Sequence, residues 1–221
     1  MTNAPRLYRM ILSQVASLES RAVPDLRPVR CSITSQLKSE SSSLVFDLVV
    51  RLLSKNDFPK WFAYELIHGH RQAMDELNVR TLENLGEGLN AWGDADAFSC
   101  YLSGPAWRNH KIRDITVHKW AQSPNRWWRR IAIVSTVPLN NTARGGTGDA
   151  SRTIAVCELV KGDRDDTIVK ALSWALRELA KKDPIAVGEY LSSERTVLSS
   201  RVLREVQNKL IIGVKNPKRL G

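Results

Sequence analysis

Apolar residues recur three and four positions apart along most of the chain, which is the spacing of one face of an α-helix. The pattern runs through Leu7, Met10, Ile11 and Val15, then Leu44, Leu48, Val49 and Leu52, then Leu82, Leu85 and Leu89. Alternating Val, Ile and Thr segments, which are typical of strands, are scarce. The pattern therefore predicts an all-α protein built from successive amphipathic helices.

The expected boundaries between these helices are short. Ser123 before Pro124 and Asp183 before Pro184 each have the pattern of a helix N-cap followed by a first-turn proline. The polar, glycine-bearing stretch 140–151 has the composition of a surface loop, and the basic end from about residue 214 that of a mobile tail. Neither has the composition of a domain linker, so we expect a single domain over residues 1–221.

The second half of the chain repeats its apolar pattern with an offset of forty residues. Trp128, Ile131 and Ala132 then align with Ile168, Ala171 and Leu172. A period near forty is typical of HEAT-like repeats, whose helix pairs stack into a solenoid with a concave surface. We therefore predict a HEAT-like helical-repeat solenoid with a concave basic groove. An irregular helical bundle is the alternative.

Composition narrows the class of protein. The chain is 43% apolar, yet no apolar run approaches the ~20 residues that span a bilayer, and residues 1–10 lack a signal peptide's apolar stretch. We expect a cytoplasmic monomer that does not enter a membrane. Three cysteines without a CxxC pair, and histidines without companions at ligand spacing, predict neither a disulfide framework nor a metal site. No cofactor is expected, because the glycines of the stretch 140–151 lack the residues of a phosphate-binding loop.

The charge of the chain indicates a polyanionic partner. Lys and Arg number 33 against 23 Asp and Glu, which gives a formal net charge of +10. In the helix expected over 166–182, Lys170, Trp174, Arg177 and Lys181 follow one another on a face away from the apolar stripe. The residue forty positions before Lys170 is Arg130, beside Arg129. A row of cations on corresponding faces of stacked repeats predicts a track for nucleic-acid phosphates.

A second segment, Trp92 to Phe98, combines an indole with a carboxylate. Trp92 and Asp96 lie four residues apart, on one face of the expected helix, while Asp94 is expected to cap that helix. A carboxylate repels a phosphate backbone. Asp96 would, however, stabilise any positive charge that developed on the ligand.

The stretches 92–98, 123–133 and 171–184 resemble those of the AlkD-type DNA alkylation repair proteins, which are HEAT-like-repeat alkylpurine DNA glycosylases. The resemblance extends over residues 40–212 in helix order and spacing. It implies that Trp92, Asp96 and Trp174 form the active-site cleft, and that Arg130 and Arg177 grip phosphates. The chain departs from the family at Gly93, where an acidic residue often follows the tryptophan.

The chemistry of these residue types suits that reaction. A purine alkylated at N3 or N7 is a cationic leaving group, and a carboxylate can stabilise the positive charge that develops on the sugar. Tryptophan faces attract cations. We therefore expect a monofunctional DNA glycosylase that acts on alkylated duplex DNA. A non-catalytic binder of damaged or branched DNA and a protein-interaction scaffold are the alternatives.

Overall fold

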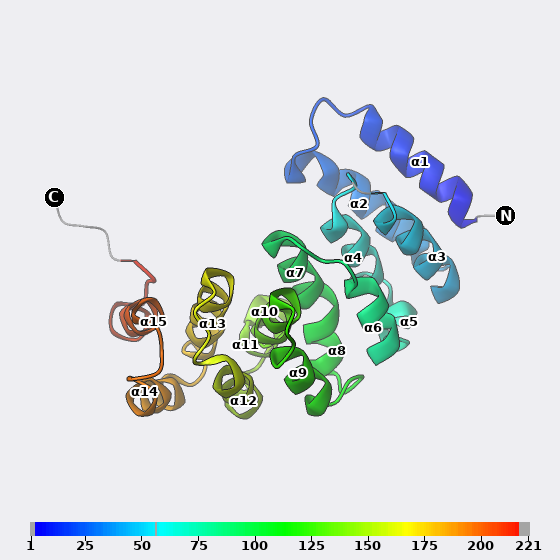
Figure 1. Ribbon diagram of the computed structural model, residues 1–221. Helices are drawn as coiled ribbons and strands as arrows, with labels where there is room; N and C mark the ends of the chain where they lie inside the picture. Colours follow the sequence, from blue (N-terminus) through cyan, green and yellow to red (C-terminus); the bar gives the residue numbers. More distant parts are fainter. Residues whose placement is uncertain (1–2, 56, 217–221) are drawn as a thin grey trace. The chain divides into compact units, whose positions relative to one another are not determined.

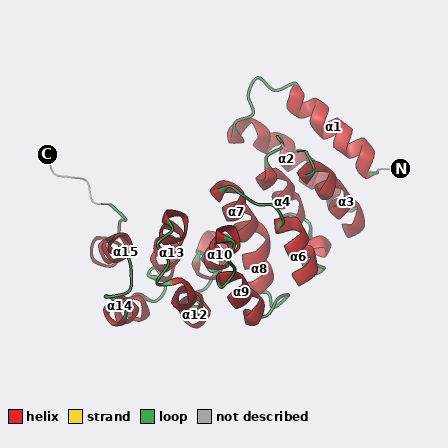
Figure 2. Cartoon of the chain, in the orientation of Figure 1, coloured by secondary structure: helices red, strands yellow, loops and turns green. Residues whose placement is uncertain are grey.

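The computed structural model describes residues 3–55 and 57–216, and helices and their connections account for all of them (Figures 1 and 2). Their contacts fall into two compact units, Met1–Gly88 and Leu89–Gly221, each with its own core. The all-α class is confirmed, whereas the single domain expected over residues 1–221 stays a prediction. No described helix is both long and apolar enough to cross a membrane.

The first unit contains six helices within the described residues. They are α1 (Ala4–Ala16), α2 (Val23–Leu37), α3 (Ser42–Leu53), α4 (Lys60–His68), α5 (Arg71–Asp75) and α6 (Val79–Gly86). Helix α3 packs against α1 and α4, and α2 also packs against α4. Tyr64, which is fully buried, donates a hydrogen bond of 3.1 Å to the carbonyl of Leu85 and so joins α4 to the end of α6.

The second unit begins with a helix that changes its pitch. Helix α7 (Trp92–Phe98) runs without a break through a π-helical segment, η1 (Ser99–Ser103), into α8 (Gly104–Arg108). The Ser99 hydroxyl donates to the carbonyl of Ala95 at 2.7 Å. Gly104 permits a close contact here, because a Cβ at this position would lie 2.7 Å from Cγ of Pro138.

The rest of the second unit is arranged as two layers of helices (Figure 1). Its elements are α9 (Asp114–Ala121), α10 (Arg126–Val134), α11 (Val137–Asn140), η2 (Thr142–Arg144), α12 (Ala150–Val160), α13 (Asp166–Leu179), α14 (Pro184–Ser193) and α15 (Ser200–Ile212). In one layer α7, α10, α13 and α15 contact one another in that order. In the other layer α9 and α12 pack against each other, and α14 packs against α13 and α15. This arrangement is compatible with the helical-repeat solenoid expected from the sequence.

The forty-residue offset corresponds to the step from α10 to α13. Ile131 and Ala171, which the offset aligns, are both fully buried. Trp128, the third aligned position of α10, is only half-buried, and its ring packs at centroid distances of 5.2 Å from Trp120 and 6.3 Å from Phe98. The offset therefore aligns buried positions at two of the three pairs, Ile131 with Ala171 and Ala132 with Leu172.

One of the two predicted helix starts is confirmed and the other is wrong. Asp183 caps α14 by accepting a hydrogen bond from the backbone N–H of Ala186, with Pro184 in the first turn. Helix α10 instead begins at Arg126, and Asn125 is its cap. Ser123 accepts from the backbone N–H of Asn125, so it stabilises the turn before the helix. The predicted basic tail lies partly outside the described residues, which end at Asn216.

Candidate active site

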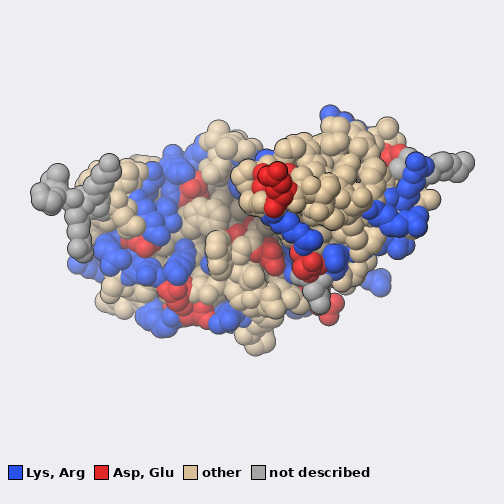
Figure 3. Space-filling view, turned by 90° about the horizontal axis from the view of Figure 1, so that it is seen from above, with Lys and Arg blue, Asp and Glu red and all other residues tan. Residues whose placement is uncertain are grey.

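The second unit contains a cleft of about 510 Å³ beside α7, α10 and α13. Its lining residues are Trp92, Asp96, Arg130, Thr167, Lys170, Trp174, Arg177 and Lys215. The structure thus brings together the three residues expected to act on the lesion and three of the five cations expected to bind DNA. Figure 3 shows Lys and Arg side chains gathered over the C-terminal part of the molecule.

An ion pair between α7 and α10 forms one side of the cleft. Nε of Arg130 donates to Oδ1 of Asp96 and Nη2 donates to Oδ2, both at 2.8 Å. Nη1 of Arg130 donates to the backbone carbonyl of Thr167, at the start of α13. The Arg130 side chain is 7% exposed and that of Asp96 is 16% exposed. Arg130 therefore fixes the carboxylate in one orientation and ties α7 to both α10 and α13.

This pairing differs from the predicted role of Arg130. The sequence assigned Arg130 to a DNA phosphate, but its guanidinium is buried and all three of its nitrogens donate to Asp96 or Thr167. A phosphate would have to compete with a bidentate carboxylate partner. The burial and the partners of Arg130 instead favour a role in holding Asp96.

Burial and the ion pair shift the pKa of Asp96 in opposite directions. Removal of the carboxylate from water raises its pKa, while the hydrogen bonds and positive charge of Arg130 lower it. The effect of burial is the larger, so the pKa of Asp96 lies above its ordinary value. Each carboxylate oxygen still has a lone pair that Arg130 does not use.

The two predicted tryptophans lie on separate helices that border the cleft. Trp92 is the first residue of α7 and is 67% exposed, an unusual state for an indole in a folded protein. Trp174 lies mid-way along α13 and is half-buried, between the fully buried Ser173 and Ala175. Both side chains line the same space as Asp96.

Three cations complete the lining of the cleft. Lys170 is exposed and pairs with Asp166 at 2.6 Å. Arg177 is half-buried, one turn after Ser173. Lys215 follows α15 and was not predicted, because its place in the basic C-terminal end is the only feature of the sequence that distinguishes it. Thr167 was also missed, since it contributes a backbone carbonyl that no side-chain pattern reveals.

Two of the predicted DNA-binding cations do not line the cleft. Arg129 lies one residue before Arg130, and its Nε pairs with Asp163 at 2.8 Å while Nη1 donates to the carbonyl of Ser123. Lys181 lies beyond the end of α13 and pairs with Glu178 at 2.7 Å. The continuous cationic track expected from spacing is therefore interrupted by local ion pairs.

The predicted cap at Asp94 is wrong. Helix α7 begins at Trp92, with Ala91 as its N-cap and no side-chain cap hydrogen bond. Asp94 lies within the first turn, where a negative charge is favourable to the helix dipole. A Cβ at Gly93 would meet no atom within 4 Å, so the departure from the family pattern at this position reflects no steric constraint in the structure.

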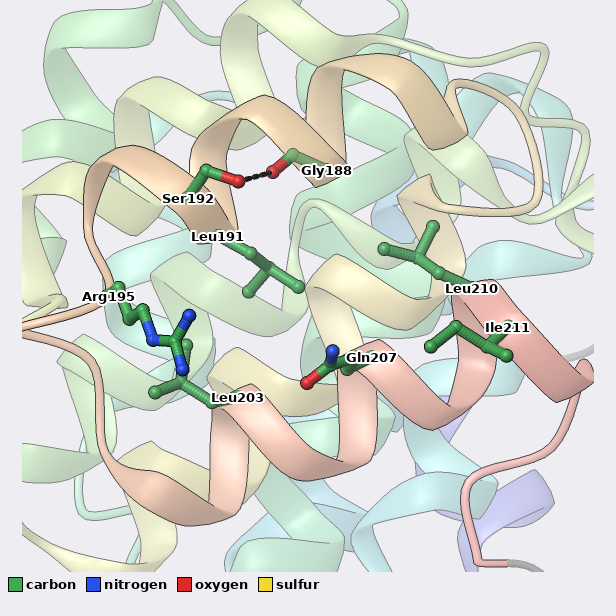
Figure 4. Close-up of a pocket in the computed structure, with 8 residues that line it drawn as sticks. All are labelled: Gly188, Leu191, Ser192, Arg195, Leu203, Gln207, Leu210 and Ile211. Carbon is green, nitrogen blue, oxygen red and sulfur yellow. Dashed lines mark hydrogen bonds between the residues drawn. The ribbon is translucent and has the colours of Figure 1, made fainter.

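A second cleft, of about 310 Å³, lies between α14 and α15 (Figure 4). Its lining residues are Gly188, Leu191, Ser192, Arg195, Leu203, Gln207, Leu210 and Ile211. This lining is mainly apolar and contains no acid, so it lacks the groups for acid-base chemistry. Within the described residues, no group of three or more His, Cys, Asp and Glu side chains could hold a metal ion.

Comparison with known proteins gives the family of the chain. No curated protein sequence matches it. A family model described as DNA alkylation repair enzyme matches residues 21–210, which include all of the residues predicted to act on the lesion or to bind DNA. The match covers most of both units, so the chain belongs to the DNA alkylation repair enzyme family.

Proposed function

We propose that this protein is a monofunctional DNA glycosylase that releases cationic N3- and N7-alkylated purines from duplex DNA. The observation that carries the proposal is the position of Asp96, a single oriented carboxylate in a cleft that two tryptophans also line. The match to a family of DNA alkylation repair enzymes supports a role in repair. The reaction and its substrate are inferred from the chemistry of the cleft.

Asp96 would act on the sugar. As the bond between the purine nitrogen and C1′ breaks, its electron pair leaves with the base, which becomes neutral, and positive charge develops on the deoxyribose. A preorganised carboxylate lowers the energy of that charge. Water then forms the new bond to C1′, and a free lone pair of Asp96 can accept its proton. The cationic base needs no general acid in order to leave.

The tryptophans would select for positive charge. An aromatic face attracts a desolvated cation by about 1 to 2 kcal/mol, whereas a neutral purine gains only stacking. Trp92, which is largely exposed, is free to meet the DNA, and Trp174 presents its indole from the cleft wall. Cationic lesions should therefore react faster than neutral ones.

Arg130 would hold the catalytic carboxylate, and the more accessible cations would hold the DNA. The buried ion pair aims Asp96 and opposes its protonation. Lys170, Arg177 and Lys215 line the same cleft and are more exposed than Arg130, which suits them for phosphate contacts.

The direct test is an excision assay on a defined duplex. DNA that contains 7-methylguanine is incubated with the protein, and free base is measured by chromatography. We expect 7-methylguanine release and an abasic site without strand cleavage, and little release from a matched duplex that contains hypoxanthine, a neutral base. Asp96→Asn serves as the control for contaminating activity. Tight, salt-dependent DNA binding without base release would instead support a non-catalytic DNA-binding protein.

A further inference from the structure

A buried carboxylate that the proposed chemistry does not use lies beside the cleft wall. Glu205, on α15, is 4% exposed, and its Oε2 accepts a hydrogen bond of 2.6 Å from the hydroxyl of Ser173 on α13. The same hydroxyl accepts a hydrogen bond of 3.2 Å from Nε of Arg177. One donor and one acceptor role satisfy the serine hydroxyl. Glu205 therefore reaches Arg177 through a single side chain.

Glu205 also attracts two other cations. Nζ of Lys215 lies 3.4 Å from its Oε2, and Nε of Arg201 lies 3.8 Å from its Oε1. Two of the cations linked to Glu205, Arg177 and Lys215, line the cleft. They come from different parts of the chain, so a common buried partner fixes them relative to each other.

The attachment of Arg177 leaves its terminal nitrogens available. Its Nε is used by Ser173, while the described residues offer no hydrogen-bond partner to Nη1 or Nη2. Burial lowers the pKa of Arg177, and the carboxylates of Glu205 and Glu178 oppose that shift. An arginine guanidinium stays protonated in proteins. A charged guanidinium held at one nitrogen presents a fork that matches a phosphate.

We propose that Glu205 is a positioning residue that holds Arg177, through Ser173, and Lys215 in the arrangement that grips the DNA backbone. The inference rests on the proposed function, because it assigns these two cations to DNA. Ordering a long side chain when DNA binds costs conformational entropy. Because Glu205 already orders Arg177 and Lys215 in the free protein, these side chains would lose less conformational entropy when DNA binds.

The direction in which Glu205→Gln changes the affinity for DNA distinguishes a positioning role from a simple effect of net charge. Glu205→Gln removes a negative charge close to a surface that binds a polyanion. If only net charge mattered, the variant would bind DNA more tightly than the wild type. A positioning role predicts the opposite, since a neutral amide attracts the cations less strongly than a carboxylate.

The experiment measures binding to an unmodified duplex over a range of salt concentrations by fluorescence anisotropy. We expect Glu205→Gln to weaken binding by about three- to tenfold, the factor for one long side chain that must be ordered. Log affinity should also fall less steeply with log salt, by up to about one unit, as one phosphate contact is lost. Glu189→Gln is the matched control, because it makes the same charge change on an exposed residue of α14 and should not weaken binding.

Ser173→Ala is the second variant, since it breaks the link to Arg177 without altering any charge. It should weaken binding by about threefold and leave the fold intact, as judged by thermal melting. In the excision assay both variants should raise KM while kcat stays within about twofold of the wild type, because neither residue meets the reacting atoms. If Glu205→Gln does not fold, the Ser173→Ala measurement decides.

Tighter or unchanged binding by folded Glu205→Gln, or unchanged binding by Ser173→Ala, would overturn the positioning role. A loss of kcat with unchanged KM would do the same. A wild-type protein that binds DNA and releases no base would refute the glycosylase activity, while the binding comparison would still test Glu205. The absence of salt-dependent DNA binding by the wild type would overturn both proposals.

Discussion

Arg130 and Asp96, which are 34 residues apart in the sequence, form a bidentate ion pair whose two hydrogen bonds both measure 2.8 Å. The guanidinium is the more deeply buried partner, so loss of Asp96 would leave the charge of Arg130 buried and without its carboxylate partner. The pair therefore couples the stability of the second unit to the group proposed for catalysis.

Arg130→Ala should lower both stability and activity. Removal of one partner of a buried ion pair typically costs about 3 to 5 kcal/mol, because the other charge stays buried and unpaired. We expect a loss of this size in the free energy of unfolding, measured by denaturant titration. The salt dependence of DNA binding should stay the same, since all three nitrogens of Arg130 already donate to Asp96 or to the carbonyl of Thr167. A flatter salt dependence would restore the phosphate-binding role predicted from the sequence.

Asp96→Asn should slow release of 7-methylguanine by about a hundredfold or more, the scale for loss of one preorganised electrostatic group. Affinity for DNA should stay the same or increase slightly, since a charge that repels phosphate is removed. The variant will also be less stable, because an amide pairs poorly with the buried Arg130, so its folded fraction must be measured alongside its rate.

Asp94→Asn is the matched control for that variant. It makes the same chemical change two residues earlier on α7, in the first turn, where loss of the charge costs about 0.3 to 1 kcal/mol. The excision rate should stay close to the wild type. Equal losses of rate in the two variants would remove the distinction between Asp96 and its neighbour.

The excision rate should fall as the pH drops through the pKa of Asp96, because protonation removes the charge that stabilises the sugar cation. Burial raises this pKa, so the acidic limb of kcat/KM against pH should lie above that of an ordinary exposed carboxyl group. Arg130→Lys weakens the interaction that opposes the rise and should move the limb to still higher pH. An acidic limb that does not move in Arg130→Lys would assign it to another group.

Trp174→Ala and Trp128→Ala should have different effects. The first should slow excision of a cationic lesion by about tenfold through loss of a cation-aromatic contact, with a small change in thermal stability. The second should cost about 3 kcal/mol of stability, because Trp128 packs against Trp120 and Phe98. Thermal melting and single-turnover excision of 7-methylguanine measure the two effects. A large loss of stability in Trp174→Ala would identify Trp174 as a packing residue.

Arg177→Ala should flatten the plot of log affinity against log salt by about one unit, and Lys181→Ala should leave it unchanged. Arg177 lines the cleft, whereas Lys181 pairs with Glu178 after the helix has ended. Lys119→Ala, on α9 in the other layer of helices, is the control. The same slope change in Arg177→Ala and Lys119→Ala would exclude the cleft as the DNA-binding surface.

The features that could be predicted from the sequence depend on residues close together in the chain. Trp92 and Asp96 are one helical turn apart, so periodicity places them on one face wherever α7 packs. The apolar stripe of α13 likewise predicts which residues are buried and sets Trp174 apart from them. The succession of helices follows from the same rule.

The features that could not be predicted depend on packing between helices. Periodicity gives the face on which Arg130 lies, but only the contact of α10 with α7 supplies Asp96 as its partner. Lys181 has the right spacing for the cationic face, yet α13 ends at Leu179, so the regular geometry no longer applies to it. The cap of α10 was misplaced because Ser123 and Asn125 are both good caps, and only the backbone distinguishes them.

The π-helical segment after α7 changes the face of the helix on which the later side chains lie. Trp107 lies eleven residues after Asp96. In a regular α-helix that spacing is about three turns, so the two side chains would lie on nearly the same face. A π-helical segment accommodates one extra residue, which turns all later side chains by about 100°. Trp107 is accordingly fully buried and donates to Asp114 at 2.8 Å. We expect deletion of one residue from Ser99–Ser103 to turn the Trp107 indole toward the face on which Asp96 lies, and so to remove a fully buried side chain from the core.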